Sequence, residues 1–551
     1  MPVQFLLPVL LAFLMTVLCG PAARAANPSP WRITKDHWTD TDERGYEIFI
    51  AALGASNCSS SESCLRSSAN PWAASDRGRF VDIDVDCAKL AYLLRAYYAW
   101  KNGLPFSYVN AIRGEGDARY DKDGNQPVSR HDIIDHGGGI DGPAALRAML
   151  KVVFTGTFRS DAQREGLVQS DFYSPALTPG SIHVGTMIYD TNGHVGIVWK
   201  VDGDGRIFYM DAHPDFTVTR SVYGAQFGQS PIRLGGGLKN WRPSTLVGAR
   251  QGAPGLVGGH MEFARNEQIE DFSLVQYFGT EPNPSHDLKA ARWFYDGNGL
   301  GFYEYVRVAV SGGKADYNPV FELKSKMKTL CNDLHDRAQY VDMAIDQAIA
   351  IRPHPAKLPA NIYDSDDGTW ESYATPSRDA RLKAGFAALY HDLGVMIALW
   401  RARDPRIVYD GNFLRDDLLK AYDEQSKACT VTYLSSDKKP VALTFDDMVH
   451  RLFVMSFDPY MCIEARWGDD SPACPDGPAK RRWNAAERRL RNSPDTPYDR
   501  TVAFSLIDLE KYAPGSGIDA SPAVDVRALI AEMPAWRVFV QSTPGQAATS
   551  N

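Results

Sequence analysis

A series of short apolar segments separated by glycine-containing turns constrains the fold of this chain more than any other feature. Met187–Asp190, His194–Val201 and Ile207–Ala212 have the length and apolar character of strands, and the turns DTNG and DGDG connect them. Turns of this composition join neighbouring antiparallel strands. The sequence therefore predicts an antiparallel sheet in which His194 opens the middle strand, directly after a turn.

A helix is predicted about one hundred residues earlier in the chain. In VDIDVDCAKLAYLLRAYYAWKNG, apolar residues recur at helical spacing from Leu90 to Tyr98, and Asn102-Gly103 ends the pattern. Cys87 falls in the first turn, where unpaired N–H groups and the helix dipole stabilise a thiolate and lower its pKa. We interpret Cys87 as a candidate nucleophile, and a small buried core residue is the alternative.

Histidines on the predicted strands supply a candidate base. His213 follows the third segment, and antiparallel pairing across the DGDG turn would bring it near His194, so that one imidazole orients the other. Asp211 competes with His213 for this third position. A histidine at a strand start is more often a surface residue, so the interpretation depends on its combination with Cys87.

The first 25 residues read as a secretory signal peptide. An apolar run extends from Phe5 to Leu18, small residues follow, and the box Ala23-Arg24-Ala25 predicts cleavage after about Ala25. We therefore expect a secreted or periplasmic protein.

Cysteine usage fits such an oxidising compartment, which favours disulfides. The chain has eight cysteines. Without Cys19 of the signal peptide an odd number remains, so at least one thiol is expected to be unpaired. The proposed pairing leaves Cys87 free and joins Cys58 with Cys64, Cys331 with Cys429, and Cys462 with Cys474, although sequence alone does not fix the connectivity.

The length of 551 residues exceeds what one hydrophobic core normally organises. Residues 26–250 mix helix and strand signals, and the glycine-rich stretch GAPGLVGGH, Gly252 to His260, is the predicted linker. Residues 261–551 are expected to form a mainly helical accessory domain. Helical periodicity predicts helices over 324–351, 378–403, 412–427, 444–466 and 479–491. The predicted class is α+β with a mostly α-helical C-terminal domain.

Charge and composition restrict the partners. The net charge of −8 argues against a nucleic-acid partner, and no stretch after the signal peptide has the length and apolar character of a membrane span. The cluster His131, Asp132, Asp135 and His136 lacks a common metal-ligand spacing. We therefore expect neither a metal nor another cofactor, and the oligomeric state is left open.

The helix opening on Asp86-Cys87-Ala88-Lys89-Leu90, followed by LTPGS, GHVGIVWKV and a polar residue one strand later, resembles the NlpC-type cell-wall peptidases and the related CHAP amidases. The resemblance covers about 130 residues, Asp86 to Asp215. It implies a papain-like core in which a helix bearing the cysteine packs on an antiparallel sheet bearing the histidine. The extra material at about 105–175 would build over the cleft.

By this resemblance Cys87 is the nucleophile, His194 the general base and His213 the orienting residue, while Asp86 would bind the free amine of the substrate. The implied activity is hydrolysis of amide bonds through an acyl-enzyme, with a peptidoglycan stem peptide or another peptide as substrate. Ala88-Lys89 replaces the Ser-Gly of many relatives. Two alternatives stay open: an acyltransferase or deamidase acting on protein, and a non-catalytic secreted binding protein.

Overall fold

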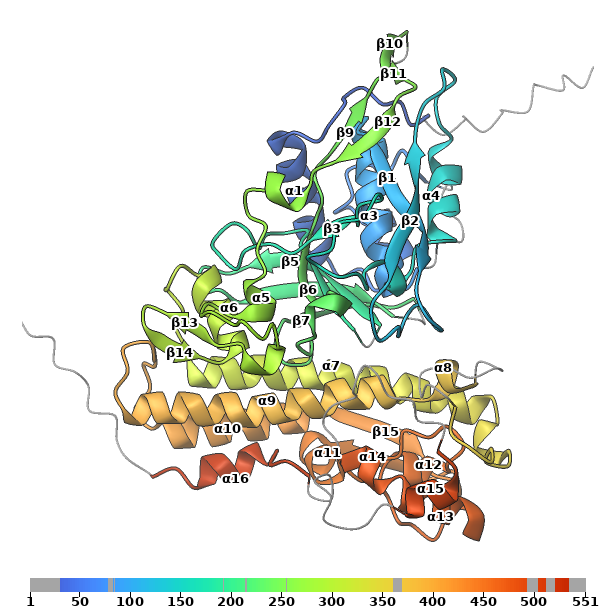
Figure 1. Ribbon diagram of the computed structural model, residues 1–551. Helices are drawn as coiled ribbons and strands as arrows, with labels where there is room; N and C mark the ends of the chain where they lie inside the picture. Colours follow the sequence, from blue (N-terminus) through green and yellow to red (C-terminus); the bar gives the residue numbers. More distant parts are fainter. Residues whose placement is uncertain are drawn as a thin grey trace, which may run out of the picture.

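The computed structural model describes residues 30–77, 83, 85–191, 193–213, 216–253, 255–359, 369–492, 504–511 and 521–534. The predicted signal peptide lies outside these residues. The described chain is α+β, with mixed helices and strands in its N-terminal part and a helical C-terminal region (Figure 1).

A six-stranded antiparallel sheet lies at the centre of the N-terminal part, in the order β3-β8-β4-β5-β6-β7. Its strands are β3 (Phe172–Tyr173), β4 (Met187–Asp190), β5 (His194–Val201), β6 (Ile207–Ala212), β7 (Val218–Val222) and β8 (Gly237–Trp241). The three predicted strands are confirmed as β4, β5 and β6. Asp190 faces His194 across the first predicted turn, and Gly196 faces Asp211 in the next strand pair.

One face of the sheet packs against α1 (Asp40–Ala55) and α3 (Cys87–Asn102). Asp86 caps the N-terminus of α3, and Gly103 ends it in the left-handed conformation at φ 65°, which favours glycine. The predicted helix is therefore confirmed from its first residue to its last. Val195, Ile197 and Met210 contribute the sheet side of this core.

The other face of the sheet packs against α6 (Phe302–Val310) and the hairpin of β13 (Trp293–Tyr295) and β14 (Asn298–Leu300). Val198 and Tyr209 contribute its sheet side. Beyond this core run the long helices α7 (Pro319–Asp346), α9 (Pro376–Arg401) and α10 (Leu414–Ala428), drawn in yellow and orange in Figure 1. The sheet thus lies between α3 on one side and a helical layer on the other.

The remaining elements surround these layers. In the N-terminal part they are α2 (Ser61–Arg66), β1 (Phe106–Arg113), β2 (Gln126–Ile133), α4 (Gly142–Leu150), β9 (Ser244–Val247), β10 (Arg250–Gly252), β11 (Gly255–Val257), β12 (His260–Phe263) and α5 (Val275–Phe278). In the C-terminal region they are α8 (Thr369–Tyr373), β15 (Thr430–Leu434), β16 (Pro440–Thr444), α11 (Phe445–Arg451), α12 (Ile463–Arg466), α13 (Pro478–Ala486), α14 (Arg488–Asn492), α15 (Leu506–Glu510) and α16 (Val526–Ala531).

The predicted linker at Gly252 to His260 differs from the structure. Its residues belong to the hairpin β10–β11, and β12 pairs back onto β9. Packing against the sheet continues through α6, so the change to the helical layer falls after Val310. Gly255, Gly258 and Gly259 adopt positive φ, which glycine does without strain, so these glycines serve the turns between paired strands and not a linker between domains.

The predicted helix over 444–466 is also different. The structure has two short helices there, α11 and α12, separated by a segment that contains Pro459. Proline has no backbone N–H and cannot continue a helix in its interior. The predicted helices over 324–351, 378–403 and 412–427 correspond to α7, α9 and α10 with shifted ends.

Three disulfides join Cys58 to Cys64, Cys331 to Cys429, and Cys462 to Cys474, and they confirm the proposed pairing. Among the described residues Cys87 is the free cysteine. The bonds are compatible with an oxidising compartment outside the cytoplasm.

One segment, Arg378–Arg401 within α9, is long and apolar enough to cross a membrane by length and composition alone. Its Leu382, Phe386 and Leu389 are buried in the helical core, as in the core helix of a globular domain. The segment is therefore weak evidence for a membrane span.

Candidate functional site

The N-terminus of α3 brings Cys87 against the first residues of β5. Its Sγ lies 3.7 Å from the carbonyl oxygen of Gly193, which is 106 residues away in the chain, and the N–H of Val195 also interacts with the sulfur. The residue is 6% exposed. Folding therefore places the thiol against the backbone on both sides of His194.

The imidazole of His194 is held by Asp211. Its Nε2 lies 2.6 Å from Asp211 Oδ2, and Asp211 Oδ1 accepts a hydrogen bond of 2.6 Å from the hydroxyl of Thr219. A carboxylate accepts, so Nε2 of His194 carries the proton and its Nδ1 is left with a lone pair. Within the described part of the chain, no hydrogen bond engages that Nδ1.

The expectation that His213 orients His194 is corrected by this arrangement. His213 Nε2 lies 2.9 Å from the hydroxyl oxygen of Thr219 and 3.7 Å from Asp211, and its ring centre is 5.7 Å from that of His194. The register explains the difference, because Asp211 faces Gly196 and so lies beside the start of β5. His213 supports Asp211 through Thr219, and its ring stacks beside that of His194 without a hydrogen bond between them among the described residues.

Cys87 and His194 do not share a hydrogen bond in the described structure. The sulfur belongs to the core on the α3 side with Val195, whereas the His194 ring lies 6.2 Å from the ring of Phe227 and beside Tyr209 on the other side. Successive side chains of a strand point to opposite faces of a sheet, which explains why neighbouring backbone positions give separated side chains. A rotation or local shift would be needed for proton transfer.

The environment of Cys87 keeps its thiol protonated. Burial and the negative charge of Asp86 raise the pKa of Cys87 to about 12, against a smaller opposing effect of the N–H groups of Val195 and Ala88. The sequence-based expectation was a lowered pKa at the helix N-terminus. That expectation is wrong for this conformation, because desolvation outweighs the helix dipole.

Burial together with the positive charge of Arg381 lowers the pKa of His194 to about 4, although Asp211 opposes the shift. For Asp211 burial favours the neutral form, but the charges of His213 and His194 and the hydrogen bonds outweigh it and hold its pKa below the ordinary value. At neutral pH the pair is thus a neutral imidazole and an ionised carboxylate, the states that a general base and its orienting residue require.

Asp86 has a structural function at the N-terminus of α3, where it is the N-cap residue. Its side chain accepts a hydrogen bond of 3.3 Å from the N–H of Lys89 and forms an ion pair of 3.0 Å with the Lys89 ammonium. An aspartate N-cap satisfies a backbone donor at the helix start. Binding of a substrate amine by Asp86 stays a prediction, and such an amine would have to compete with Lys89.

Helices of the C-terminal region cover the His194 side of the site. A small cavity of about 20 Å³ remains there, lined by His194, Tyr209, Asp211, His213, Gln226, Phe227, Asp333, Asp336, Arg378 and Arg381. Such a volume accommodates about one water molecule. The charged residues of α7 and α9 were not found from the sequence, where they read as solvent-facing positions of amphipathic helices. The available signal was the spacing of three residues between Asp333 and Asp336 and between Arg378 and Arg381, which places each pair on one face of its helix.

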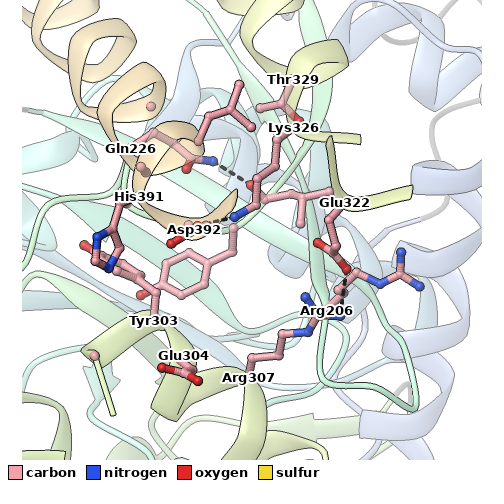
Figure 2. Close-up of a pocket in the computed structure, with 18 of the residues that line it drawn as sticks. Arg206, Gln226, Tyr303, Glu304, Arg307, Glu322, Lys326, Thr329, His391 and Asp392 are labelled. Carbon is pink, nitrogen blue, oxygen red and sulfur yellow. Dashed lines mark hydrogen bonds and ion pairs between the residues drawn. The ribbon is translucent and has the colours of Figure 1, made fainter. Parts of the chain in front are cut away.

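A larger cavity of about 250 Å³ adjoins the small one and shares Asp333 and Gln226 with it. It lies between the β6–β7 side of the sheet, α6, α7 and α9 (Figure 2). Phe302, Leu330 and Met396 are among its apolar residues. Ion pairs line its edge, between Lys326 and Asp392 and, at 2.8 Å, between Arg307 and Glu322.

Asp333 is the group at the junction of the two cavities. Burial raises its pKa to about 7, with Arg381 opposing the shift and the charges of Asp336 and Asp211 adding to it. One of its oxygens is buried without a hydrogen-bond partner among the described residues. The junction therefore has unused hydrogen-bonding capacity beside the His194–Asp211 pair.

No family model, no curated protein and no solved structure matches this chain.

Proposed function

We propose that this protein is a thiol-dependent hydrolase of amide bonds, with Cys87 as nucleophile, His194 as base and Asp211 as the residue that orients His194. The observation that supports it best is the 2.6 Å contact between His194 and Asp211 on the strand whose first residues contact the sulfur of Cys87. Resemblance to the NlpC-type and CHAP enzymes favours a peptidoglycan stem peptide or another peptide as substrate.

In the proposed reaction, Nδ1 of His194 takes the proton of the Cys87 thiol, and the thiolate attacks the amide carbonyl carbon. The backbone N–H of Cys87 donates to the oxyanion of the tetrahedral intermediate. His194 then protonates the leaving amine, which leaves a thioester on Cys87. Water, deprotonated by His194, hydrolyses the thioester and restores the thiol.

The described conformation corresponds in this proposal to a closed resting form. Both partners are neutral, their side chains are apart, and the space beside His194 holds about one water molecule. Catalysis requires a local shift at the start of β5 that brings the Cys87 thiol and the His194 ring together, and movement of α7 and α9 to admit the substrate. The larger adjoining cavity, which shares Asp333 and Gln226, is the proposed entry for part of the substrate.

The proposal is tested with purified mature protein, its Cys87→Ser and Asp211→Asn variants, and peptidoglycan or peptide substrates, by measuring newly formed amines. The expected result is loss of turnover in Cys87→Ser and a drop of about 100-fold or more in Asp211→Asn. His260→Ala is the matched control, because this histidine is exposed on β12, away from the site. Full turnover by Cys87→Ser would rule out the proposed nucleophile.

Deep burial of Cys87 and its separation from His194 favour a second candidate, a secreted binding protein on a related core. This candidate predicts no turnover on any amide substrate and no change in ligand binding for Cys87→Ser. New amines that depend on Cys87 would exclude it. Transfer of the acyl group to a protein amine instead of water would show up as a conjugate in the same assay.

A further inference from the structure

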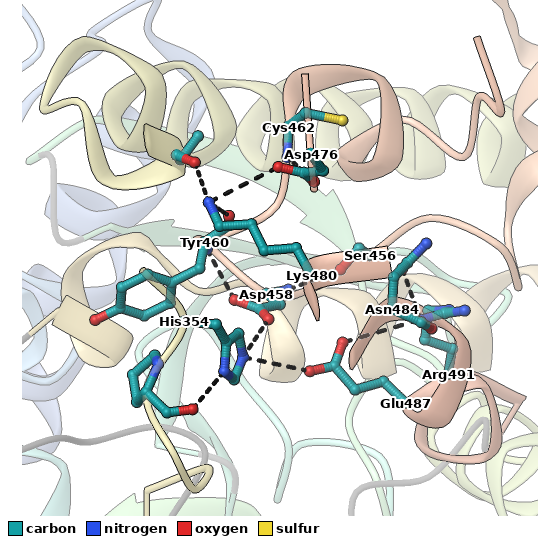
Figure 3. A network of polar contacts seen from close by, with 12 residues as sticks. His354, Ser456, Asp458, Tyr460, Cys462, Asp476, Lys480, Asn484, Glu487 and Arg491 are labelled. Atoms are coloured by element: carbon teal, nitrogen blue, oxygen red, sulfur yellow. Dashed lines mark hydrogen bonds and ion pairs between the residues drawn. The ribbon is translucent and has the colours of Figure 1, made fainter. Parts of the chain in front are cut away.

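A second group of buried polar side chains lies in the C-terminal region, apart from the Cys87 site. His354, Asp458 and Glu487 are 3%, 0% and 0% exposed in their side chains. His354 Nε2 lies 2.8 Å from Asp458 Oδ2 and 3.9 Å from Glu487 Oε1, and the three potential ligand atoms all lie within 4.8 Å of one another (Figure 3). Three segments distant in sequence thus point these atoms toward one place.

The other ring nitrogen of His354 makes Nε2 its candidate metal ligand. Nδ1 lies 2.6 Å from the carbonyl oxygen of Pro355, which can only accept, so Nδ1 carries a hydrogen. Nε2 lies 2.8 Å from Asp458 Oδ2, so without an ion it donates a hydrogen to that carboxylate, and a bound metal ion would replace this hydrogen. Histidines that bind metals commonly donate their second N–H to a backbone carbonyl or carboxylate, as Nδ1 does here.

Glu487 provides independent evidence for a missing partner. Both of its carboxylate oxygens are buried, and neither has a hydrogen-bond partner among the described residues. Burial, together with the Asp458 carboxylate that lies beside it, raises the pKa of Glu487 well above its ordinary value, while two basic groups, His354 and the Arg491 guanidinium, each lie 3.9 Å away. That guanidinium Nη1 already donates to the carbonyl and side-chain oxygens of Asn484, at 2.6 and 3.0 Å. A carboxylate buried in this state is costly unless a cation or a proton neutralises it.

We propose that His354 Nε2, Asp458 Oδ2 and Glu487 Oε1 bind one divalent transition-metal ion, with Zn²⁺ as the favoured ion. Tetrahedral zinc ligands at about 2.0 to 2.2 Å from the ion lie about 3.3 to 3.6 Å from one another. The two separations of 2.8 and 3.9 Å bracket this range. Asp458 Oδ1 accepts a hydrogen bond of 2.8 Å from the N–H of Tyr460, whereas Oδ2 contacts His354 Nε2 and is the oxygen on the side of the proposed ion.

The proposed ion would join parts of the C-terminal region that no disulfide connects directly. His354 follows α7, Asp458 lies between α11 and α12, and Glu487 lies between α13 and α14. Two carboxylates balance the charge of a divalent ion, and a water molecule can complete four-coordination. Binding to the folded state alone stabilises the fold in proportion to the affinity.

The test measures metal content of the purified full chain by mass spectrometry, followed by chelation and titration of the apoprotein with Zn²⁺ or Co²⁺. The expected result is about one equivalent per chain, a Tm lower by about 5 °C or more after chelation, and its recovery with Zn²⁺. Co²⁺ should give a visible absorption spectrum. Absence of stoichiometric binding, with a Tm that neither chelator nor Zn²⁺ changes, would overturn the proposal in favour of a purely ionic network.

Variants locate the ion. Glu487→Gln and Asp458→Asn should lose the metal, and their Tm should no longer respond to the chelator. Glu464→Gln is the matched control, because Glu464 is a buried carboxylate of the same region that is hydrogen-bonded to Ser436. Metal retained in Glu487→Gln, or lost equally in Glu464→Gln, would contradict the assignment. The titration of the apoprotein with metal tests the proposal even if the variants fail to fold.

Discussion

Burial of Cys87 predicts an unreactive thiol in the native protein. Its pKa of about 12, against an ordinary value of 9.0, implies about 1,000-fold less thiolate than in the unfolded chain at neutral pH. Iodoacetamide reacts with the thiolate, so native Cys87 should be alkylated about 1,000-fold more slowly than the same residue in urea without reductant. The assay follows the Cys87 peptide by mass spectrometry at pH 7.5.

The pH dependence gives this prediction its sign. Below pH 9 both rates rise tenfold per pH unit, and their ratio stays constant. Above pH 9 the thiol of the unfolded chain is fully ionised while native Cys87 continues to ionise up to about pH 12, so the ratio narrows. Disulfide-bonded cysteines do not interfere, because the other described cysteines are paired. Native and unfolded rates within about tenfold of each other at pH 7.5 would refute the reasoning.

Three further predictions concern stability, measured by urea unfolding. The pKa of His194 is lowered to about 4, so as the pH falls the histidine takes up its proton in the unfolded chain before it does so in the folded one. The free energy of unfolding should therefore fall by up to about 3 kcal/mol between pH 6.5 and 4. His194→Gln should remove this part of the pH dependence. Arg337→Met should cost about 3 to 5 kcal/mol, because it leaves the buried Asp379, 2.7 Å away, without its partner; adding Asp379→Leu should recover most of the loss. Replacing Cys331 and Cys429 by serine should cost about 4.7 kcal/mol, because that disulfide closes a loop of 98 residues.

Each of these three predictions has a contradicting outcome. An unchanged acid slope in His194→Gln would assign the slope to other groups. A double variant of Arg337 and Asp379 no more stable than Arg337→Met would show that loss of packing, not the unpaired charge, causes the destabilisation. A loss below about 2 kcal/mol on removing the 331–429 disulfide would mean that the unfolded chain is already restricted there.

The local elements were predictable because their signals are local. Apolar spacing after Cys87 and the Asn102-Gly103 end predicted α3, and the turns DTNG and DGDG predicted β4, β5 and β6. The cysteine count and the spacing of the pairs predicted three disulfides with Cys87 left free. The helix, the hairpins and two of the disulfides depend on residues that are close in sequence, and Cys331 with Cys429 is the pair left when the two local pairs and Cys87 are set aside.

Sequence by itself determined the α+β class and the set of residues with suitable chemistry, whereas the tertiary structure decided their contacts and electrostatics. Strand register made Asp211 the partner of His194, and the faces of the sheet separated its ring from Cys87. Long-range packing placed α7 and α9 over the site and desolvated the thiol. Such effects depend on which distant surfaces meet, because burial and nearby charge set a pKa and neither is encoded in local spacing.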